Sequence, residues 1–72
     1  MDILELCNKL KEKRKELGYT IEEVTEKTKL YPSVIKDLEE GNIKNLDPAY
    51  LKGFIKIYAS FLGINIEEFL QQ

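Results

Sequence analysis

The arrangement of helix-start and helix-stop residues constrains the fold of this chain more than any other feature. Side chains that cap helix N-termini precede three apolar segments, at Asp2, Thr20 and Asp47. Pro32 and Pro48 are predicted to lie in the first turn of a helix, where proline is common. Glycine, the usual residue just past a helix C-terminus, follows at Gly18, Gly41 and Gly63. No stretch alternates polar and apolar residues with period two, so the sequence predicts an all-α fold.

We predict five short helices joined by brief connections. They run from Asp2 to Gly18, from Thr20 to Thr28, from Pro32 to Gly41, from Asp47 to Gly63, and onward from Asn65. Capping boxes are predicted for the pairs Asp2–Glu5, Thr20–Glu23 and Asn65–Glu68, and hydrophobic staples for Tyr19–Val24, Leu46–Leu51 and Ile64–Phe69. The stretch NIKNL, residues 42–46, is predicted to be a loop. Helical spacing predicts these buried residues: Ile3, Leu6, Leu10, Leu17, Val24, Ile35 and Leu38.

Length and composition favour one small domain over residues 1–72, near the lower size limit for an unaided hydrophobic core. There is one cysteine and no histidine, so we predict no internal disulfide, no metal site and no cofactor. Cys7 falls on an apolar helical face, which favours a core residue over a reactive thiol. No apolar run approaches the roughly 20 residues that span a bilayer, and no signal peptide is present. We therefore expect a reducing, cytoplasmic setting.

Two short helices joined by a few residues, inside a five-helix domain, have the layout of a helix-turn-helix. The segment LGYTIEEVTEKTKLYPSVIKDLEEGN, residues 17–42, resembles the helix-turn-helix of Cro/C1-type repressors. In that family an arginine near the end of the first helix pairs with a glutamate of the third, which implies an ion pair between Arg14 and Glu39. Arg14 is the only arginine of the chain, and a guanidinium suits a half-buried bidentate pair better than an ammonium does. The alternative is a surface arginine without such a partner.

Sequence-specific DNA binding through the third helix is the obvious function of this fold. The third helix, however, carries Asp37, Glu39 and Glu40 against one cation, Lys36. Affinity for DNA comes largely from lysine and arginine at the phosphates, so acidic side chains there oppose it. In the third helix only Ser33 and Lys36 have side chains that could donate a hydrogen bond to DNA bases. Six lysines at positions 9, 11, 13, 15, 27 and 29 are interleaved with glutamates, which favours a mixed-charge surface over a basic patch. The net charge of −2 adds a minor argument against nucleic acid or anionic membrane as partners.

The fourth predicted helix has more apolar surface than one core contact needs. Leu51, Ile55, Tyr58 and Leu62 fall on one arc, which is a normal core stripe. A second apolar arc lies beside it and consists of Tyr50, Phe54, Ile57 and Phe61. Two interpretations remain open. Either the helix is central and packs on two sides, or Tyr50 and Phe54 form an exposed pair that docks on another protein.

The segment LDPAYLKGFIKIYASFLGINIEEFL, residues 46–70, resembles the fourth and fifth helices of RodZ cytoplasmic domains. The resemblance rests on this series of residues: Tyr50, Gly53, Phe54, Lys56, Tyr58, Ala59 and Gly63. It departs from the RodZ pattern at Leu46-Asp47-Pro48, which is one residue longer than Leu-Pro, at Lys52 and Lys56, which replace arginines, and at Lys29, which replaces a turn glycine.

The RodZ resemblance implies a protein-binding function. RodZ-like domains bind the bacterial actin homologue MreB at the cytoplasmic face of the inner membrane. The family's two aromatic contacts fall on Tyr50 and Phe54, with Lys36, Lys52 and Lys56 as rim partners. We therefore expect a cytoskeletal adaptor for rod-shape maintenance, joined to the membrane only through a segment absent from this chain. The alternative is a DNA-binding regulator that uses Ser33 and Lys36, and an enzyme is not expected.

Overall fold

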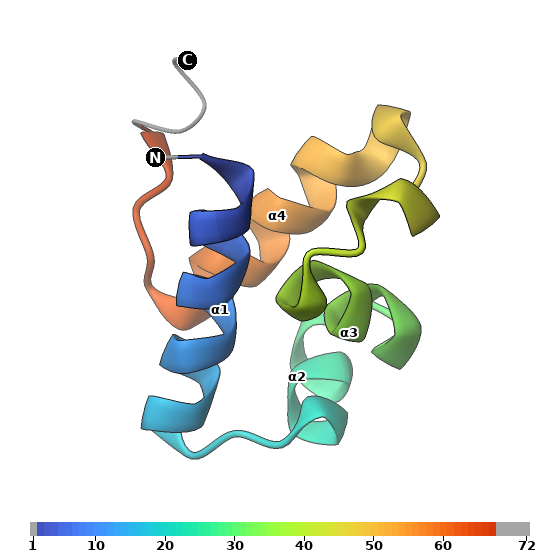
Figure 1. Cartoon of the computed structure of the whole chain (residues 1–72). Coiled ribbons are helices and arrows are strands. Elements are labelled where there is room, and N and C mark those ends of the chain that lie inside the picture. Colours follow the sequence, from blue (N-terminus) through green and yellow to red (C-terminus); the bar gives the residue numbers. More distant parts are fainter. Residues whose placement is uncertain (1, 68–72) are drawn as a thin grey trace.

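The computed structural model describes residues 2–67, and these residues are folded into helices without a strand (Figure 1). The α-helices are α1 (Ile3–Leu17), α2 (Ile21–Thr28), α3 (Pro32–Glu40) and α4 (Pro48–Leu62). A 3-10 helix, η1 (Ile43–Asn45), connects α3 to α4. The predicted all-α fold is therefore confirmed over these residues. The predicted loop at residues 42–46 was wrong in one respect, since its middle residues form η1.

The fifth predicted helix falls largely on residues that the structure does not describe. Asn65 Oδ1 accepts a hydrogen bond from the Glu67 backbone N–H at 2.9 Å, as an N-cap side chain does. Glu68 and Phe69, the other members of the predicted capping box and staple, lie outside the described residues. The described part of the chain thus has four α-helices, one fewer than the five predicted.

The predicted helix boundaries are confirmed at the N-terminal and the C-terminal ends of the helices. Asp2 Oδ1 accepts from the Glu5 N–H at 2.8 Å, and Thr20 and Glu23 form a reciprocal capping box. Asp47 Oδ1 accepts from the Ala49 N–H at 2.8 Å at the start of α4. Three glycines end α1, α3 and α4 in the left-handed region, with φ values of 80°, 76° and 78°. Local hydrogen bonding therefore marks the starts of α1, α2 and α4, while α3 starts at Pro32 without a capping side chain.

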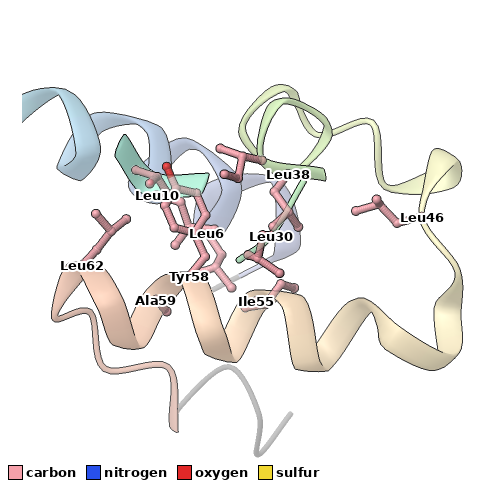
Figure 2. Packing of buried hydrophobic residues seen from close by; sticks show 11 residues of the cluster. Leu6, Leu10, Leu30, Leu38, Leu46, Ile55, Tyr58, Ala59 and Leu62 are labelled. Atoms are coloured by element: carbon pink, nitrogen blue, oxygen red, sulfur yellow. The ribbon is translucent and has the colours of Figure 1, made fainter. Parts of the chain in front are cut away.

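The core lies between α4 and the other three helices. Ile55, Tyr58 and Leu62 point from one side of α4 toward Leu6 and Leu10 of α1 (Figure 2). Leu38 of α3 and Leu30 of the α2–α3 connection complete this cluster. α1 packs against α3 and α4, while α2 packs against α3 and α4. One side of α4 is thereby buried over most of its length.

Leu17 corrects the predicted face of α1. It lies at helical spacing from Leu6 and Leu10, but its side chain is 47% exposed, whereas both of those leucines are fully buried. Leu17 is the last residue of α1, beside the terminating Gly18. Periodicity identifies the face of a helix but does not say how far along that face the neighbouring helices reach.

Candidate functional site

The side of α4 that turns away from the core carries apolar side chains at its start and middle. Tyr50 is 62% exposed and Ile57 is 45% exposed, while Phe54 is half-buried. With Gly53, these residues occupy positions i, i+3, i+4 and i+7 of one helix. Gly53, which the sequence assigns to the polar arc with Lys56 and Ser60, lies at the edge of this face. We call the surface formed by Tyr50, Gly53, Phe54 and Ile57 the outer face. A contiguous exposed apolar face is a feature that a lone small domain does not need for folding.

The aromatic pair of the outer face is preformed. The rings of Tyr50 and Phe54 lie with their centroids 6.2 Å apart and their planes tilted by 34°. This spacing is within the range of favourable aromatic pairs. Phe54 also packs against the core cluster, so its backbone and ring have a fixed support. The pair presents aromatic area without having to order flexible side chains on binding.

Phe61, at the C-terminal end of the second apolar arc, packs against another part of the same domain. The Phe61 ring lies 5.0 Å from the ring of Tyr19, which belongs to the α1–α2 connection. Both residues are half-buried and pack against the core. The surplus apolar surface predicted from the sequence therefore divides in two. Phe61 and part of Phe54 serve intramolecular packing, whereas Tyr50 and Ile57 face outward.

The three lysines predicted as rim partners do not gather around the outer face. Lys52 follows Tyr50 by two residues and lies on nearly the opposite side of α4. There it lines a groove with Ile3 of α1 and Pro48. Lys56 lies on the same polar side and lines another hollow with Ser60 and Ile64. Lys36 is exposed on α3, so Lys52 and Lys56 share the polar side of α4 and Lys36 belongs to a different helix.

Arg14 and Glu39 are brought together in a bidentate pair that links α1 to α3. Arg14 Nε lies 2.7 Å from Glu39 Oε2, and Arg14 Nη2 lies 3.0 Å from Glu39 Oε1. Arg14 Nη1 also donates to the Tyr19 carbonyl at 2.8 Å. The Tyr58 hydroxyl donates to Glu39 Oε2 from α4. The buried carboxylate is therefore satisfied by two helices at once, and this three-residue network has a structural role.

The network shifts the titration of its members. Burial, followed by the hydrogen bond to Glu39, raises the pKa of Tyr58 above its ordinary value of 10.0. The hydrogen bonds to Glu39 raise the pKa of Arg14, which thus stays charged. Burial also raises the pKa of the Cys7 thiol, so this cysteine is held in the unreactive protonated form. None of these groups opens onto the outer face.

The start of α3, which contacts DNA bases in DNA-binding members of this fold, is also exposed. We call it the reading position. Ser33 and Lys36 of α3 are both open to solvent, and so is Tyr31, which is 75% exposed just before α3. Because Glu39 is paired with Arg14, it does not add to the surface charge of α3. Exposed Glu40 and half-buried Asp37 remain beside Lys36. α2 adds three exposed glutamates at positions 22, 23 and 26. The surface around the reading position is therefore richer in carboxylates than in cations.

Neither a metal centre nor a membrane-spanning helix is present among residues 2–67. No three side chains of histidine, cysteine, aspartate or glutamate in this range lie together so that they hold a metal ion. No helix in this range has both the length and the apolar character that crossing a membrane requires.

One exposed residue, Tyr31, was not singled out from the sequence. Ile57 and Ile55 were assigned to different arcs of the helix, and Ile57 is exposed whereas Ile55 is buried. Tyr31 was read as part of a connection, although the following Pro32 fixes it as the N-cap of α3 without a capping side chain. An aromatic residue immediately before a helix-starting proline is the signal that identifies this position. How far the side chains of Tyr31 and Ile57 are exposed depends on the packing of α2 and α4.

One comparison with known proteins identifies a family. A family model described as a helix-turn-helix domain matches residues 9–69. This range includes α2, α3, α4 and most of α1, so the match covers the reading position and the outer face together. Searches of the curated proteins and of the solved structures return no significant match.

Proposed function

The chain belongs to the helix-turn-helix family that includes the RodZ N-terminal domain, and from that premise we propose that it is a cytoskeletal adaptor. Its partner in this proposal is the bacterial actin homologue MreB. The domain binds the filament, and a membrane-anchored segment outside the present sequence connects it to the inner membrane. Family membership alone fits both an adaptor and a DNA-binding protein, so the choice rests on the surface chemistry.

The exposed outer face of α4 is the single observation that carries this proposal. Tyr50 and Ile57 expose about half or more of their side-chain surface, although apolar burial is the main stabilising term for a small domain. Tyrosine and phenylalanine are the kinds of residue that dominate the energetics of protein interfaces. An apolar, uncharged face is suited to a protein surface and has no cation for a phosphate backbone.

Hot-spot behaviour sets the expected size of the contribution. A central aromatic anchor in a protein interface is worth about 2 kcal/mol or more when it is truncated to alanine. This is a loss of about thirtyfold in affinity. Tyr50 is the more exposed of the two rings, and the ring of Phe54 lies beside it. In this proposal Tyr50 supplies most of the contact area and Phe54 fixes its orientation.

The lysines have a secondary role in the proposal. Lys52 and Lys56 lie on the other side of α4 and Lys36 lies on α3, so none of them surrounds the aromatic pair. We assign to them a long-range attraction toward acidic groups on the filament. Such charges mainly raise the association rate and are screened by salt. Alanine substitution of any one of them is therefore expected to weaken binding less than Tyr50→Ala does.

Co-sedimentation with polymerised MreB from the same organism tests the proposal. The wild-type domain is expected to pellet with the filaments, whereas Tyr50→Ala and Phe54→Ala are expected to remain in the supernatant. Each variant is checked for helicity and melting temperature, because half-buried Phe54 also contacts the core. If the folded variants pellet like the wild type, or if the wild type itself does not pellet, the adaptor function is wrong.

A DNA-binding regulator is the second candidate, and the exposed start of α3 is the observation that favours it. Tyr31 and Ser33 offer hydroxyl groups and Lys36 offers a cation in the position that enters the major groove in this fold. The carboxylates of α2 and α3 oppose this function. Binding to duplex DNA that weakens steeply with salt, and that Lys36→Ala reduces, would support it.

A further inference from the structure

Gly53 differs from the other glycines of the chain. Gly18, Gly41 and Gly63 end helices with φ between 76° and 80°, a conformation that side chains with a Cβ adopt poorly. Gly53 lies inside α4 and is not among the residues with positive φ. Glycine is one of the poorest helix formers. Neither helix propensity nor backbone conformation therefore explains why residue 53 is a glycine.

Packing within the domain does not explain Gly53 either. A Cβ built on Gly53 has no atom within 4 Å apart from its chain neighbours and the nearby backbone of its own helix, and the residue is exposed. By contrast, a Cβ on Gly41 would lie 2.9 Å from Leu4 Cδ2, so that glycine makes room for a neighbour of the same chain. The space above Gly53 is left free by the domain itself.

The position of Gly53 on the outer face indicates what the space is for. Tyr50, Gly53, Phe54 and Ile57 stand at i, i+3, i+4 and i+7, the spacing of four residues that frame a hole for a side chain of a facing element. Three corners carry large apolar side chains, and the fourth carries none. The missing side chain opens the face at this corner and allows close approach of a neighbour.

We propose that Gly53 is a binding residue, at which one large apolar side chain of the MreB-type filament protein enters between Tyr50, Phe54 and Ile57. This inference rests on the proposed function and adds a fourth position to the docking face. The occupant is apolar because three of the four corners are large apolar side chains and none is charged, while Lys56 follows Gly53 at i+3, outside the four corners. A lipid surface is a poorer fit, since one open corner admits a single side chain and a membrane contact would bury a broader apolar face.

A Gly53→Ala substitution separates folding from binding. Because the added Cβ meets nothing within the domain, alanine is expected to raise the melting temperature by about 4 °C or more through its higher helix propensity. The same methyl group fills the corner that the partner needs, so the affinity for polymerised MreB is expected to fall about tenfold or more. Gly53→Val is expected to bind still more weakly. A stabilised variant that has lost binding cannot be explained by unfolding.

Asn8→Ala is the matched control, because Asn8 is exposed on α1, outside the outer face, and alanine again raises helix propensity. It is expected to stabilise the domain and to bind like the wild type. If Tyr50→Ala abolishes binding while Gly53→Ala and Gly53→Val bind like the wild type, the role of Gly53 is refuted and the adaptor function stands. If the wild type does not bind, both proposals fail. A lower melting temperature for Gly53→Ala would reveal an internal role and also refute the inference.

Discussion

At the residue scale, Glu39 connects three helices through one carboxylate. Both oxygens are bonded to Arg14, and one of them also accepts from the Tyr58 hydroxyl. A buried charge is costly unless it is paired and fully hydrogen-bonded, and here it is both. Arg14 is the only residue of the chain with the planar fork that this arrangement requires. The relative positions of α1, α3 and α4 therefore depend on a few atoms.

Replacing Arg14 tests this network. Arg14→Lys keeps the positive charge but loses the bidentate pair and the bond to the Tyr19 carbonyl, so we expect a loss of about 2 kcal/mol in the free energy of unfolding. Arg14→Ala leaves the buried carboxylate without its charge partner and is expected to cost about 3–5 kcal/mol. Urea unfolding measures both values, with the exposed Lys15→Ala on the same helix as control. Equal stability of Arg14→Lys and wild type would contradict the structural role.

Tyr58 predicts a pH dependence at the alkaline end. Its pKa in the folded state is raised above the ordinary value of 10.0, so the folded chain keeps a proton that the unfolded chain releases. The corresponding stability is fully present below about pH 10 and decreases as the pH rises above that value. Tyr58→Phe has no such proton. It is expected to be less stable at pH 7 but to lose less stability between pH 10 and 11.

Thermal unfolding of both proteins from pH 7 to 11 checks this expectation. The two proteins differ only in the hydroxyl of residue 58, so the difference between the two curves isolates Tyr58. Parallel curves throughout this range would show that the hydroxyl of Tyr58 does not resist ionisation.

Lys29 ends α2 in a conformation that favours glycine. Its φ is 67°, and it is the only non-glycine residue with positive φ among residues 2–67. A side chain with a Cβ is strained there by about 1 kcal/mol. We expect Lys29→Gly to raise the free energy of unfolding by up to about 1 kcal/mol in urea unfolding. Lys27→Gly, inside α2, serves as control and is expected to destabilise by about the same amount. Destabilisation by both substitutions would contradict the strain at Lys29.

At the scale of the element, the two sides of α4 serve different purposes. The inner side, with Ile55, Tyr58 and Leu62, is buried, while Tyr50 and Ile57 on the outer face are exposed. The N-terminal Asp47 cap and the terminal Gly63 fix the helix independently of the outer face. α4 is therefore a rigid support on which the outer face is held in place.

Alanine substitutions along α4 distinguish the two sides by stability alone. Ile55→Ala removes buried atoms and is expected to cost about 2–5 kcal/mol. Tyr50→Ala and Ile57→Ala remove exposed side chains and are expected to cost less than about 1 kcal/mol each. Chemical unfolding of the three variants checks this contrast. A cost above about 2 kcal/mol for Tyr50→Ala would mean that the outer face belongs to the core.

The sequence predicted these elements well because their ends depend on local chemistry. Thr20 with Glu23, Asp47, and the three terminal glycines act within four residues of their own position. Leu17 was misplaced because its burial depends on neighbours distant in the sequence. The bond from Tyr58 to Glu39 spans 19 residues and was not foreseen, since periodicity shows that Tyr58 faces inward but not which group its hydroxyl meets. The split of the apolar arc at Phe61 likewise depends on Tyr19, in another part of the chain.

At the scale of the whole molecule, a helix-turn-helix fold presents two surfaces of opposite chemistry. One surface, around α2 and α3, is polar and carries more carboxylates than cations. The other, along the start and middle of α4, is apolar and uncharged. Since fold alone does not decide function, the chemistry of these surfaces must. We propose that the apolar surface binds a protein and that the start of α3 has no DNA target.

Parallel titrations of one preparation of the domain against polymerised MreB and against mixed duplex DNA, each at 50 and 200 mM salt, test this claim most directly. An adaptor domain is expected to bind the filament saturably and with little dependence on salt, because the contact is apolar, and to bind DNA much more weakly. DNA binding that is tighter than filament binding and falls steeply between the two salt concentrations would contradict this expectation, because that dependence shows that cations of the domain neutralise phosphates.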